Sequence, residues 1–511
     1  MVAGSNPVLD DLAKAIHIEV AQMVEHWYKN LILKRRSKMS TLFEAVNSTA
    51  LTANGAVTNA SSLNKNVDLF FLAGASRGKN IVPTFAGALA EDPEVAVRIL
   101  QWTRDARGGA GERATFRNLF EYLLKTEPAL ASRIMPKVPE VGRWDDLLIA
   151  FGSPLEREAL RMIAFALNDV KDGLCAKWMP RQGAEANKIR SYMRLTPKLY
   201  RKLLVSLSNT VEQKMCAKDW SGIVYPHVPS VAAGRYQKAF LKHDPMGYAE
   251  YKAKLATGEA KINASVSYPY DVIRSLNHGD RAVAIEQWKA LPNYLEGSDE
   301  NILPIVDVSG SMTWTTVSGS ITPLDVAVSL GLYVSERMGG VFKDQFITFS
   351  GTPEMVHLKG DLGKRYDQMC RSNVGGNTDV QAVFKLILGA AVQHKVAVKD
   401  MPTKILILSD MEFDQCVTAG TGHNYYNRGS VSVSAMTMIE KEYEAAGYKV
   451  PQIVFWNLNG RAGNSPVTYN KVGAALVSGF SPSIVKSVLG GEEMTPISIM
   501  LKTVMTQRYD F

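Results

Sequence analysis

The chain has 511 residues, of which 46% are hydrophobic and 21% are charged, and its formal net charge is +8. These values are typical of a soluble globular protein with two or three domains. No apolar run is long enough to cross a bilayer, which excludes a membrane-spanning helix and argues against a membrane partner.

The start of the chain lacks a secretory signal, because residues 1–11 do not show a basic stretch followed by an apolar one. We therefore expect a cytoplasmic protein, in the host cytoplasm if a phage encodes it. The four cysteines are Cys175, Cys216, Cys370 and Cys416. They lack the paired spacing of zinc ligands and do not suggest a disulfide framework, so we expect reduced, buried thiols.

Residues 1–50 are assigned to an N-terminal helix and an arm. Apolar residues recur at helical spacing from Leu9 to Tyr28 and predict an amphipathic helix. From Val46 to Lys65 the chain is rich in Ser, Thr, Asn, Ala and Gly and shows no clear period. We therefore predict a linker or an irregular arm there.

The next region, residues 51–298, is predicted to be an α-helical domain. From Asn66 to about Leu255 the pattern is helical almost throughout, with helices of roughly ten to twenty residues joined by short turns. Successive helices with short connections indicate an α-solenoid, in which each helix pair packs on its neighbours. The sequence shows no fixed repeat length.

One part of this helical region is strongly basic. Lys171–Lys261 carries 17 Lys and Arg against 7 Asp and Glu, a net charge of +10. Aromatic residues are interleaved with these charges, as a nucleic-acid surface with stacking platforms requires; they are Trp178, Tyr192, Tyr200, Trp220, Tyr225, Tyr236 and Phe240. The alternative is a set of solvated helix faces whose aromatic residues belong to the core. The candidate RNA-binding side chains are Lys177, Arg181, Lys188, Arg190, Arg194, Lys214, Lys218, Arg235, Lys238 and Lys242.

Residues 299–511 are predicted to form a doubly wound α/β domain, and the polar stretch Gly297–Glu300 marks its boundary. Apolar strand patterns alternate here with amphipathic helix patterns, which is typical of a mostly parallel sheet covered by helices. The expected strands are 302–306, 342–349, 355–358 at an edge, 404–409, 452–456 and 474–477. The expected helices are 323–338, 362–371, 380–392 and 435–446, with further helices after residues 481 and 495.

Five oxygen-bearing side chains fall at predicted strand ends or in a loop beside them. They are Asp307, Ser309 and Ser311 after the first strand, Thr378 in a Gly-rich loop, and Asp410 after the strand 404–409. Sites in open α/β sheets form at the carboxyl ends of strands, so we expect these side chains to converge. Carboxylate and hydroxyl oxygens are hard ligands that suit Mg²⁺ or another hard divalent cation. The alternative for the first loop is a Ser-rich turn in which Ser309 or Ser311 caps the next helix.

The order of these residues resembles the metal-ion-dependent adhesion site of von Willebrand factor A domains. That site has Asp-x-Ser-x-Ser, then a Thr in a Gly-rich loop, then Ser-Asp after a strand. The resemblance implies that Asp307, Ser309 and Ser311 are first-loop metal ligands, with Thr378 from the second loop and Asp410 from the third. It also implies that a carboxylate from a protein partner fills the open metal position.

Two short stretches of the helical region, Arg104–Arg113 and Gly142–Leu147, carry a second resemblance. They resemble turns between HEAT-like helices in the Ro autoantigen family, the TROVE-domain proteins. The first stretch lacks the Gly-Lys-Ser/Thr ending of a phosphate-binding loop and follows a helix, so we expect no nucleotide cofactor. Alternatively, both stretches are structural, with Arg side chains at helix carbonyls and with Trp144, Asp145 and Asp146 as an anchor and an N-cap.

The chain resembles more closely still a Ro-like family of viruses, bacteria, fungi and plants, in which such helices precede the A domain. Stretches between residues 176 and 264 carry this likeness. The Ro resemblance implies that HEAT-like helices close into a ring whose two ends the A domain clasps. It implies that single-stranded 3′ ends of misfolded RNAs enter a basic central hole, while structured small non-coding RNAs bind the outer surface.

Three functions are open at this point: a Ro-like RNA-binding protein of a ribonucleoprotein, a metal-dependent protein-binding scaffold without RNA, and a metal-dependent hydrolase. We expect no enzyme, because Asp307 lacks the second Asp of the metal-dependent phosphatases and no two of the eight histidines share metal-ligand spacing. The Gly-, Ser- and Thr-rich stretch 417–433 is predicted to be a lid or partner loop above the metal site. Arg461, at a strand end, is a candidate contact for an acidic partner.

Overall fold

The computed structural model describes residues 49–52, 57–264, 267–317, 320–350, 352–372, 378–413, 439–461, 463–490 and 494–511. All of them belong to one compact unit, Thr49–Phe511. The predicted N-terminal helix, Cys416 and the predicted loop 417–433 lie outside the described residues. Within the described ranges, no helix has both the length and the apolar character that crossing a membrane requires.

The described chain begins with a short antiparallel hairpin of β1 (Thr49–Leu51) and β2 (Val57–Asn59). The prediction of a linker or irregular arm is therefore wrong for these residues. Strands of three residues are too short to show a period of two. The hairpin is held by tertiary pairing instead, because the backbones of Asn59 and Ser465 exchange hydrogen bonds of 3.0 and 2.7 Å.

The predicted helical region is confirmed in its helical character, although its helices are as short as 4 residues and no longer than 14. Several begin where a capping side chain precedes a proline, as at Asp92-Pro93, Thr196-Pro197 and Asp244-Pro245. The helices are α3 (Lys65–Ala73), α4 (Val82–Glu91), α5 (Pro93–Arg104), α6 (Arg113–Thr126), α7 (Pro128–Ile134), α8 (Val138–Val141), α9 (Glu156–Phe165), α10 (Gly173–Trp178), α11 (Ala184–Tyr192), α12 (Pro197–Leu207), α13 (Val211–Cys216), α14 (Ser230–His243), α15 (Pro245–Thr257), α16 (Pro269–His278) and α17 (Arg281–Lys289).

The C-terminal region contains the predicted doubly wound sheet, in the order β5-β4-β3-β6-β7-β8. Its strands are β3 (Ile302–Val306), β4 (Gln345–Thr348), β5 (Met355–His357), β6 (Lys404–Ser409), β7 (Gln452–Asn457) and β8 (Ala474–Ser478). Neighbouring strands are parallel except for the edge strand β5, which is antiparallel to β4. β4 starts three residues later than predicted, because a 3₁₀ turn at Gly340–Phe342 precedes it and Asp344 has a positive φ of 58°.

Helices accompany this sheet, and those of the described residues are α18 (Ser311–Trp314), α19 (Pro323–Arg337), α20 (Leu362–Arg371), α21 (Val380–His394), a helix at 439–445, α23 (Val485–Val488) and α24 (Pro496–Val504). β3, β6 and β8 are buried along their whole length. The strand order reverses between β3 and β6, and the carboxyl ends of two such strands diverge into a crevice suited to a site.

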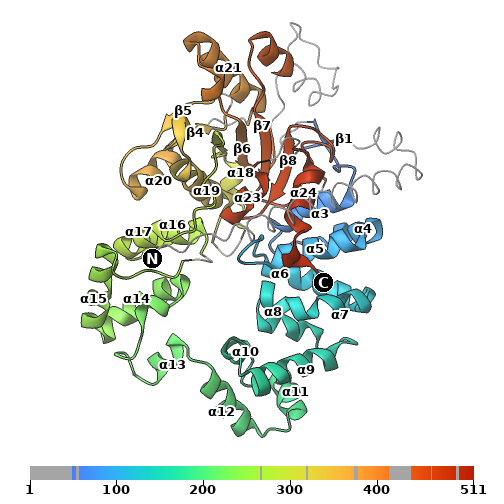
Figure 1. Ribbon diagram of the computed structural model, residues 1–511, viewed down its shortest axis with the longest axis vertical. Coiled ribbons are helices and arrows are strands. Elements are labelled where there is room, and N and C mark those ends of the chain that lie inside the picture. Colours follow the sequence, from blue (N-terminus) through green and yellow to red (C-terminus); the bar gives the residue numbers. More distant parts are fainter. Residues whose placement is uncertain are drawn as a thin grey trace, which may run out of the picture. The chain divides into compact units, whose positions relative to one another are not determined.

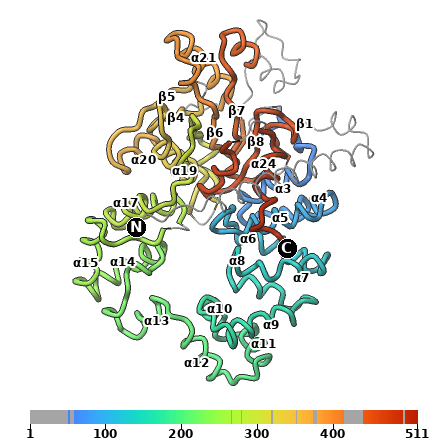
Figure 2. The backbone as a smooth tube through the Cα atoms, in the orientation of Figure 1, coloured from blue at the N-terminus to red at the C-terminus, as the bar shows by residue number. Residues whose placement is uncertain are grey.

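Both ends of the helical region attach to this domain (Figure 1). At the first end, the Ser478 hydroxyl of β8 donates to the Phe70 carbonyl (2.7 Å) and accepts from the Gly74 amide (3.0 Å). Only glycine fits here, because a Cβ at Gly74 would lie 2.3 Å from the Ser478 carbonyl oxygen. At the second end, the Trp288 indole donates to Glu336 of α19 (2.8 Å). The intervening helices follow one another in chain order along an arc between these attachments (Figure 2).

Candidate functional site

The ends of β3 and β6 bring two buried aspartates together. Asp307 follows β3 and Asp410 follows β6, and each is 1% exposed. The Asp307 amide donates to the Leu408 carbonyl (3.1 Å), and the Ser409 hydroxyl donates to Asp307 Oδ2 (2.6 Å). The first and third predicted loops are therefore in direct contact at the carboxyl edge of the sheet.

The two serines of the first loop face each other. The Ser309 amide donates to Asp307 Oδ1 (2.9 Å), and the Ser309 and Ser311 hydroxyl oxygens lie 3.0 Å apart. The alternative prediction, that one of these serines caps the next helix, is wrong. The N-cap of α18 is Gly310 with no side-chain hydrogen bond, and the N-cap of α19 is Thr322. The serine oxygens are thus not used as caps.

Thr378 brings the second predicted loop to the same edge. Thr378 is 2% exposed, and its hydroxyl donates to the Glu412 carbonyl (3.4 Å). The Glu412 amide in turn donates to Asp410 Oδ1 (3.2 Å). All five predicted metal-binding residues therefore lie in one connected network, while Gly375, Gly376 and Asn377 of the predicted loop lie outside the described residues.

The two aspartates lie in an environment that disfavours their charge. Burial raises the pKa of Asp307 to about 6, against hydrogen bonds from Ser409 and Ser309 that lower it. Burial also raises the pKa of Asp410. Asp410 Oδ2 is buried and accepts no hydrogen bond from any described residue, and Nη2 of Arg461 is 4.0 Å away. A buried carboxylate oxygen without a partner is unfavourable, so this arrangement suits an added cation.

Two further side chains, those of Arg461 and Lys79, border the site. Arg461 Nη1 pairs with Glu412 Oε1 at 3.1 Å. Lys79, from the turn between α3 and α4, donates to the Gly460 carbonyl (2.8 Å) and to Asn459 Oδ1. Burial and the charge of Arg461 lower the pKa of Lys79 to about 8. The strand-end position of Arg461 is a signal in the sequence, whereas nothing in the local sequence around Lys79 indicates its approach.

The donor set limits which metal could bind. Among the described residues, no group of three or more His, Cys, Asp or Glu side chains is arranged to hold a metal ion. A cation at this edge would depend on the two carboxylates Asp307 and Asp410 together with hydroxyl oxygens. Such a set is hard and low in charge, which fits Mg²⁺ better than zinc or copper.

The ten predicted RNA-binding side chains lie on α10–α14 and the turns between these helices. Seven are exposed and three are half-buried; the half-buried ones are Lys177, Arg190 and Lys214. Of the ten, Lys188 alone lies in an ion pair with another described residue, Glu156 at 2.8 Å. The positive charge of this segment is therefore largely available to an anionic partner; the exposed side chains are Arg181, Lys188, Arg194, Lys218, Arg235, Lys238 and Lys242.

The aromatic residues of the basic segment differ in how exposed they are. Tyr200, Tyr225 and Phe240 are 1%, 7% and 0% exposed and belong to the core, so the prediction of stacking platforms is wrong for these three. Tyr192 is 41% exposed and is free to stack on a base. Trp178 lies under the Arg143 guanidinium, whose central carbon is 3.8 Å from its ring centroid. Composition could not distinguish these rings because it does not say which helix face each ring occupies.

Of the two stretches that resemble Ro turns, the second is centred on a buried carboxylate. Asp146 is fully buried and accepts from Arg104 Nε (2.7 Å), Arg117 Nε (2.7 Å) and the Arg143 amide (3.0 Å). The last of these bonds satisfies the backbone amide of Arg143, the N-cap residue of the 3₁₀ helix Trp144–Ala150. Asp146 is therefore structural, as the alternative interpretation expects, but the N-cap of this helix is Arg143 and not one of the predicted residues.

The first stretch joins distant parts of the chain. The buried Asp105 carboxylate accepts from Arg508 Nη2 (2.7 Å) and the Tyr509 hydroxyl (3.0 Å) near the C-terminus. Glu112 pairs with Arg77 at 2.5 Å. The Arg77 guanidinium also donates to the Tyr270 hydroxyl of α16 (3.2 Å). This turn thus links the first helices, the last helices and the C-terminal segment.

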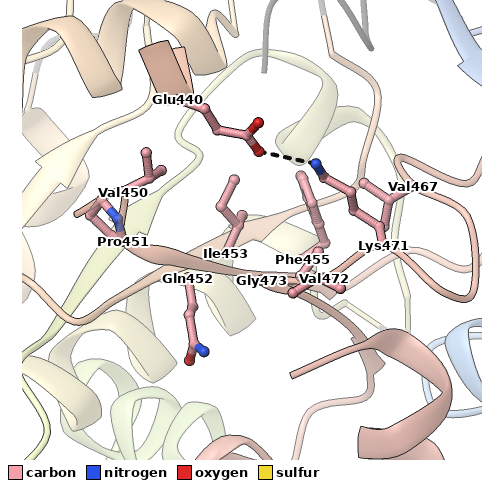
Figure 3. Close-up of a pocket in the computed structure, with 11 residues that line it drawn as sticks. Glu440, Val450, Pro451, Gln452, Ile453, Phe455, Val467, Lys471, Val472 and Gly473 are labelled. Atoms are coloured by element: carbon pink, nitrogen blue, oxygen red, sulfur yellow. Dashed lines mark hydrogen bonds and ion pairs between the residues drawn. The ribbon is translucent and has the colours of Figure 1, made fainter. Parts of the chain in front are cut away.

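A small pocket lies at the opposite, amino end of the sheet (Figure 3). It has a volume of ≈ 180 Å³ and an apolar wall that includes Ile453 and Phe455. Glu440 and Lys471 form an ion pair of 3.1 Å across it. None of the predicted metal-binding or RNA-binding residues lines this pocket, so it is separate from the acidic site.

The fold and the site define a class of protein: a helical region followed by a doubly wound α/β domain with an acidic site at the carboxyl edge of its sheet. Residues 301–507 match the family model described as Domain of unknown function (DUF7788), and residues 52–139 and 163–300 match the one described as Domain of unknown function (DUF2828). An uncharacterized protein of Acanthamoeba polyphaga mimivirus is 28% identical over 514 residues, covering 88% of this chain and 86% of that protein. Among solved structures, the Deinococcus radiodurans RO (RSR) protein is similar with a TM-score of 0.47 and 14% identity, covering 86% of this chain and 99% of that chain. Sequence similarity to the mimivirus protein therefore extends over most of both regions.

Proposed function

We propose that this protein binds single-stranded RNA through its helical region and holds a divalent cation on its α/β domain as an adhesion site for a partner carboxylate. The observation that carries the RNA part is the basic segment Lys171–Lys261, with its net charge of +10 and seven exposed candidate side chains. Exposed Lys and Arg side chains along successive helices are what a phosphate backbone requires. The Ro-like motifs of the helical region point to the same function.

The attachment of both helical ends to the α/β domain supports the ring that the Ro resemblance implies. In such a ring, the basic helices α10–α14 lie between the two attachments and present their charges to an RNA strand. Binding would depend mainly on phosphate contacts and on stacking at exposed rings such as Tyr192. We therefore propose misfolded RNAs with single-stranded ends or small non-coding RNAs as the ligands.

Photo-crosslinking tests where RNA binds. Single-stranded RNA with 4-thiouridine should crosslink to peptides from Lys171–Lys261, because its phosphates follow that surface. Crosslinks confined to the α/β domain would contradict the RNA part of the proposal. Absence of any crosslink would favour the second candidate, a metal-dependent protein-binding scaffold without RNA.

The acidic site carries the second part of the proposal, because its residues fit a hard divalent cation. Ser309, Ser311, Thr378 and the two aspartates offer only oxygen ligands. Asp410 Oδ2 accepts no hydrogen bond from a described residue, and its nearest positive group, Arg461 Nη2, is 4.0 Å away. When bound, the cation would supply a Lewis-acidic position for a carboxylate of a protein partner.

The residues of this chain would prepare that site. Ser409 and the Ser309 amide orient the Asp307 carboxylate, and the Glu412 amide orients Asp410. Arg461 and Lys79 add positive charge at the rim, which favours an acidic partner. We propose binding without catalysis at this site.

The buried Asp307 carboxyl makes a testable prediction. Its folded pKa is about 6, above the ordinary 3.8, so the folded state favours the protonated form. Without a divalent cation, the protonated Asp307 carboxyl stabilises the folded state fully below about pH 4. This stabilisation, about 3 kcal/mol, is lost as pH rises through about 6. In urea unfolding with a chelator present, Asp307→Asn should remove this part of the pH dependence, whereas the parts that come from Asp410 and Asp271 should remain. An unchanged pH profile in the variant would contradict the assignment.

Cation binding itself has a direct readout. Electron paramagnetic resonance of added Mn²⁺ should show one bound ion per chain, and Asp410→Ala should release it, because the variant lacks the carboxylate with the unpartnered oxygen. Asp400→Ala, which changes an aspartate on a 3₁₀ turn before β6, serves as the matched control and should bind Mn²⁺ normally. Equal binding by wild type and Asp410→Ala would count against the site.

A further inference from the structure

The helical region contains a pocket of its own, apart from the acidic site. It lies between α14 and the helix pair α16–α17 and has a volume of ≈ 380 Å³. Gly234, Arg235 and Gln237 line it from α14, and Asp271 and Arg274 line it from α16. A volume of this size is within the range of small-ligand sites and can hold one nucleotide unit. Arg235 is also one of the candidate RNA-binding residues, so the pocket adjoins the basic surface.

The polar groups of the pocket are held in place by neighbouring backbone. Gln237 Oε1 accepts from the Asp280 amide at the start of α17 (3.1 Å), which fixes the orientation of its side-chain amide. The side-chain Nε2 of Gln287 donates to the Ser230 carbonyl (3.2 Å), and Gln287 is 2% exposed. Fixed amide groups lose little conformational entropy when they bind a ligand, which suits recognition of a base edge.

The pocket carries both positive and negative side chains, which suit different parts of a nucleotide. Arg235 and Arg274 are exposed and present guanidinium groups, which are well suited to a phosphate. Asp271 is half-buried, and burial raises its pKa to about 6, so it is an acceptor at pH 7.5. A carboxylate accepts hydrogen bonds from the amino groups of adenine, cytosine or guanine. Uracil offers only its N3–H, which lies between two carbonyl oxygens that repel a carboxylate.

We infer that this pocket holds one nucleotide of the bound single-stranded RNA, with its phosphate at Arg235 and Arg274 and the edge of an amino-bearing base at Gln237, Gln287 and Asp271. The inference rests on the proposed RNA-binding function and adds a base preference to it. The remaining basic surface contacts phosphates and reads no sequence.

Gly234 offers a way to fill the pocket without changing charge. It lies inside α14, where glycine is unfavourable by about 1 kcal/mol relative to alanine. A Cβ at this position would lie 3.4 Å from Ser275 Oγ, in ordinary van der Waals contact, and the pocket that Gly234 lines offers room for further atoms. Gly234→Leu should therefore fold and occupy the pocket. Circular dichroism and the melting temperature check its fold.

The experiment measures fluorescence anisotropy of labelled rA12 and rU12 with the full chain at pH 7.5. Wild type should bind rA12 about tenfold more tightly than rU12, which is within the usual discrimination of one well-placed base contact. Gly234→Leu should reduce this ratio to about one while leaving rU12 affinity within about twofold. Arg274→Ala, which removes an exposed side chain, should weaken rA12 binding more than the charge-matched Arg201→Ala on α12, which should leave the ratio unchanged.

Each outcome decides the inference. Equal binding of rA12 and rU12 by wild type, or a ratio that Gly234→Leu leaves unchanged, would overturn the pocket assignment and leave the proposed function standing. Failure of wild type to bind either RNA would overturn both. Displacement of rA12 by micromolar free AMP would also overturn it, because the pocket would then be a site for a free nucleotide.

Discussion

Removing three positive charges from α14 should weaken RNA binding by about ten- to hundredfold at low salt, which is roughly what three phosphate contacts contribute. The variant is Arg235→Ala, Lys238→Ala and Lys242→Ala combined. All three side chains are exposed, so the substitutions should not disturb the fold. The slope of log affinity against log salt should also fall in magnitude by about 2, because each contact to a single strand contributes about 0.7.

The control for this variant removes the same charge elsewhere. Lys385, Lys399 and Lys449 are exposed lysines of the α/β domain. Their combined replacement by Ala changes the net charge equally, so a difference between the two variants reports location. We expect the control to keep the salt slope of wild type. If both triple variants weaken binding to the same extent, RNA is held by overall charge and the assignment to α10–α14 is wrong.

Asp146→Ala should cause the largest loss of stability, about 3–5 kcal/mol for the unfolding of the helical region. Asp146 is fully buried and accepts hydrogen bonds from Arg104, Arg117 and the Arg143 backbone. Its removal leaves the Arg104 guanidinium, itself almost fully buried, without its carboxylate partner. The loss arises from that uncompensated charge and from the Arg143 amide at the start of the 3₁₀ helix, which loses its acceptor.

Urea unfolding followed by circular dichroism measures this effect, and the adjacent Asp145→Ala is the matched control. Asp145 is more exposed and pairs with Arg117 and Arg143, so its replacement should cost about 1 kcal/mol or less. The double variant Arg104→Ala with Asp146→Ala should be more stable than the sum of the two single losses predicts. If the urea unfolding transition of Asp146→Ala coincides with that of wild type, the turn Gly142–Leu147 does not stabilise the helical region.

The convergence of the five candidate metal-binding residues at one sheet edge was predictable because each lies beside a clear sequence signal. Apolar runs that end abruptly at Asp307 and Asp410 mark the carboxyl ends of buried parallel strands, and such ends meet in a doubly wound sheet. Strand order then brings β3 and β6 together, which places Ser309 and Ser311 at the same edge. The signal is a local sequence pattern, an apolar run that ends at a polar residue, so each residue could be selected without knowledge of distant contacts.

Other features depend on contacts between distant segments and could not be predicted. Lys79 reaches the rim of the acidic site because Gly460 and Ala75 pair through their backbones, and nothing in the local sequence records that pairing. The same is true of Asp105, whose role is set by Arg508 and Tyr509 about four hundred residues away. Whether an aromatic ring of the basic segment is buried or exposed depends on the helix face that it occupies. The short, irregular helices obscure the hydrophobic periodicity that would identify this face.

The measurement that tests the central claim most directly is anisotropy of the purified protein with a labelled single-stranded RNA that has a free 3′ end. It is made at low and moderate salt, with Mg²⁺ and with a chelator, against a fully paired duplex. We predict salt-sensitive binding that prefers the single strand and does not change with the chelator, because the basic helices and the acidic site are separate. Binding no tighter than that of the duplex would contradict the account and leave the cation-dependent protein partner as the function to pursue.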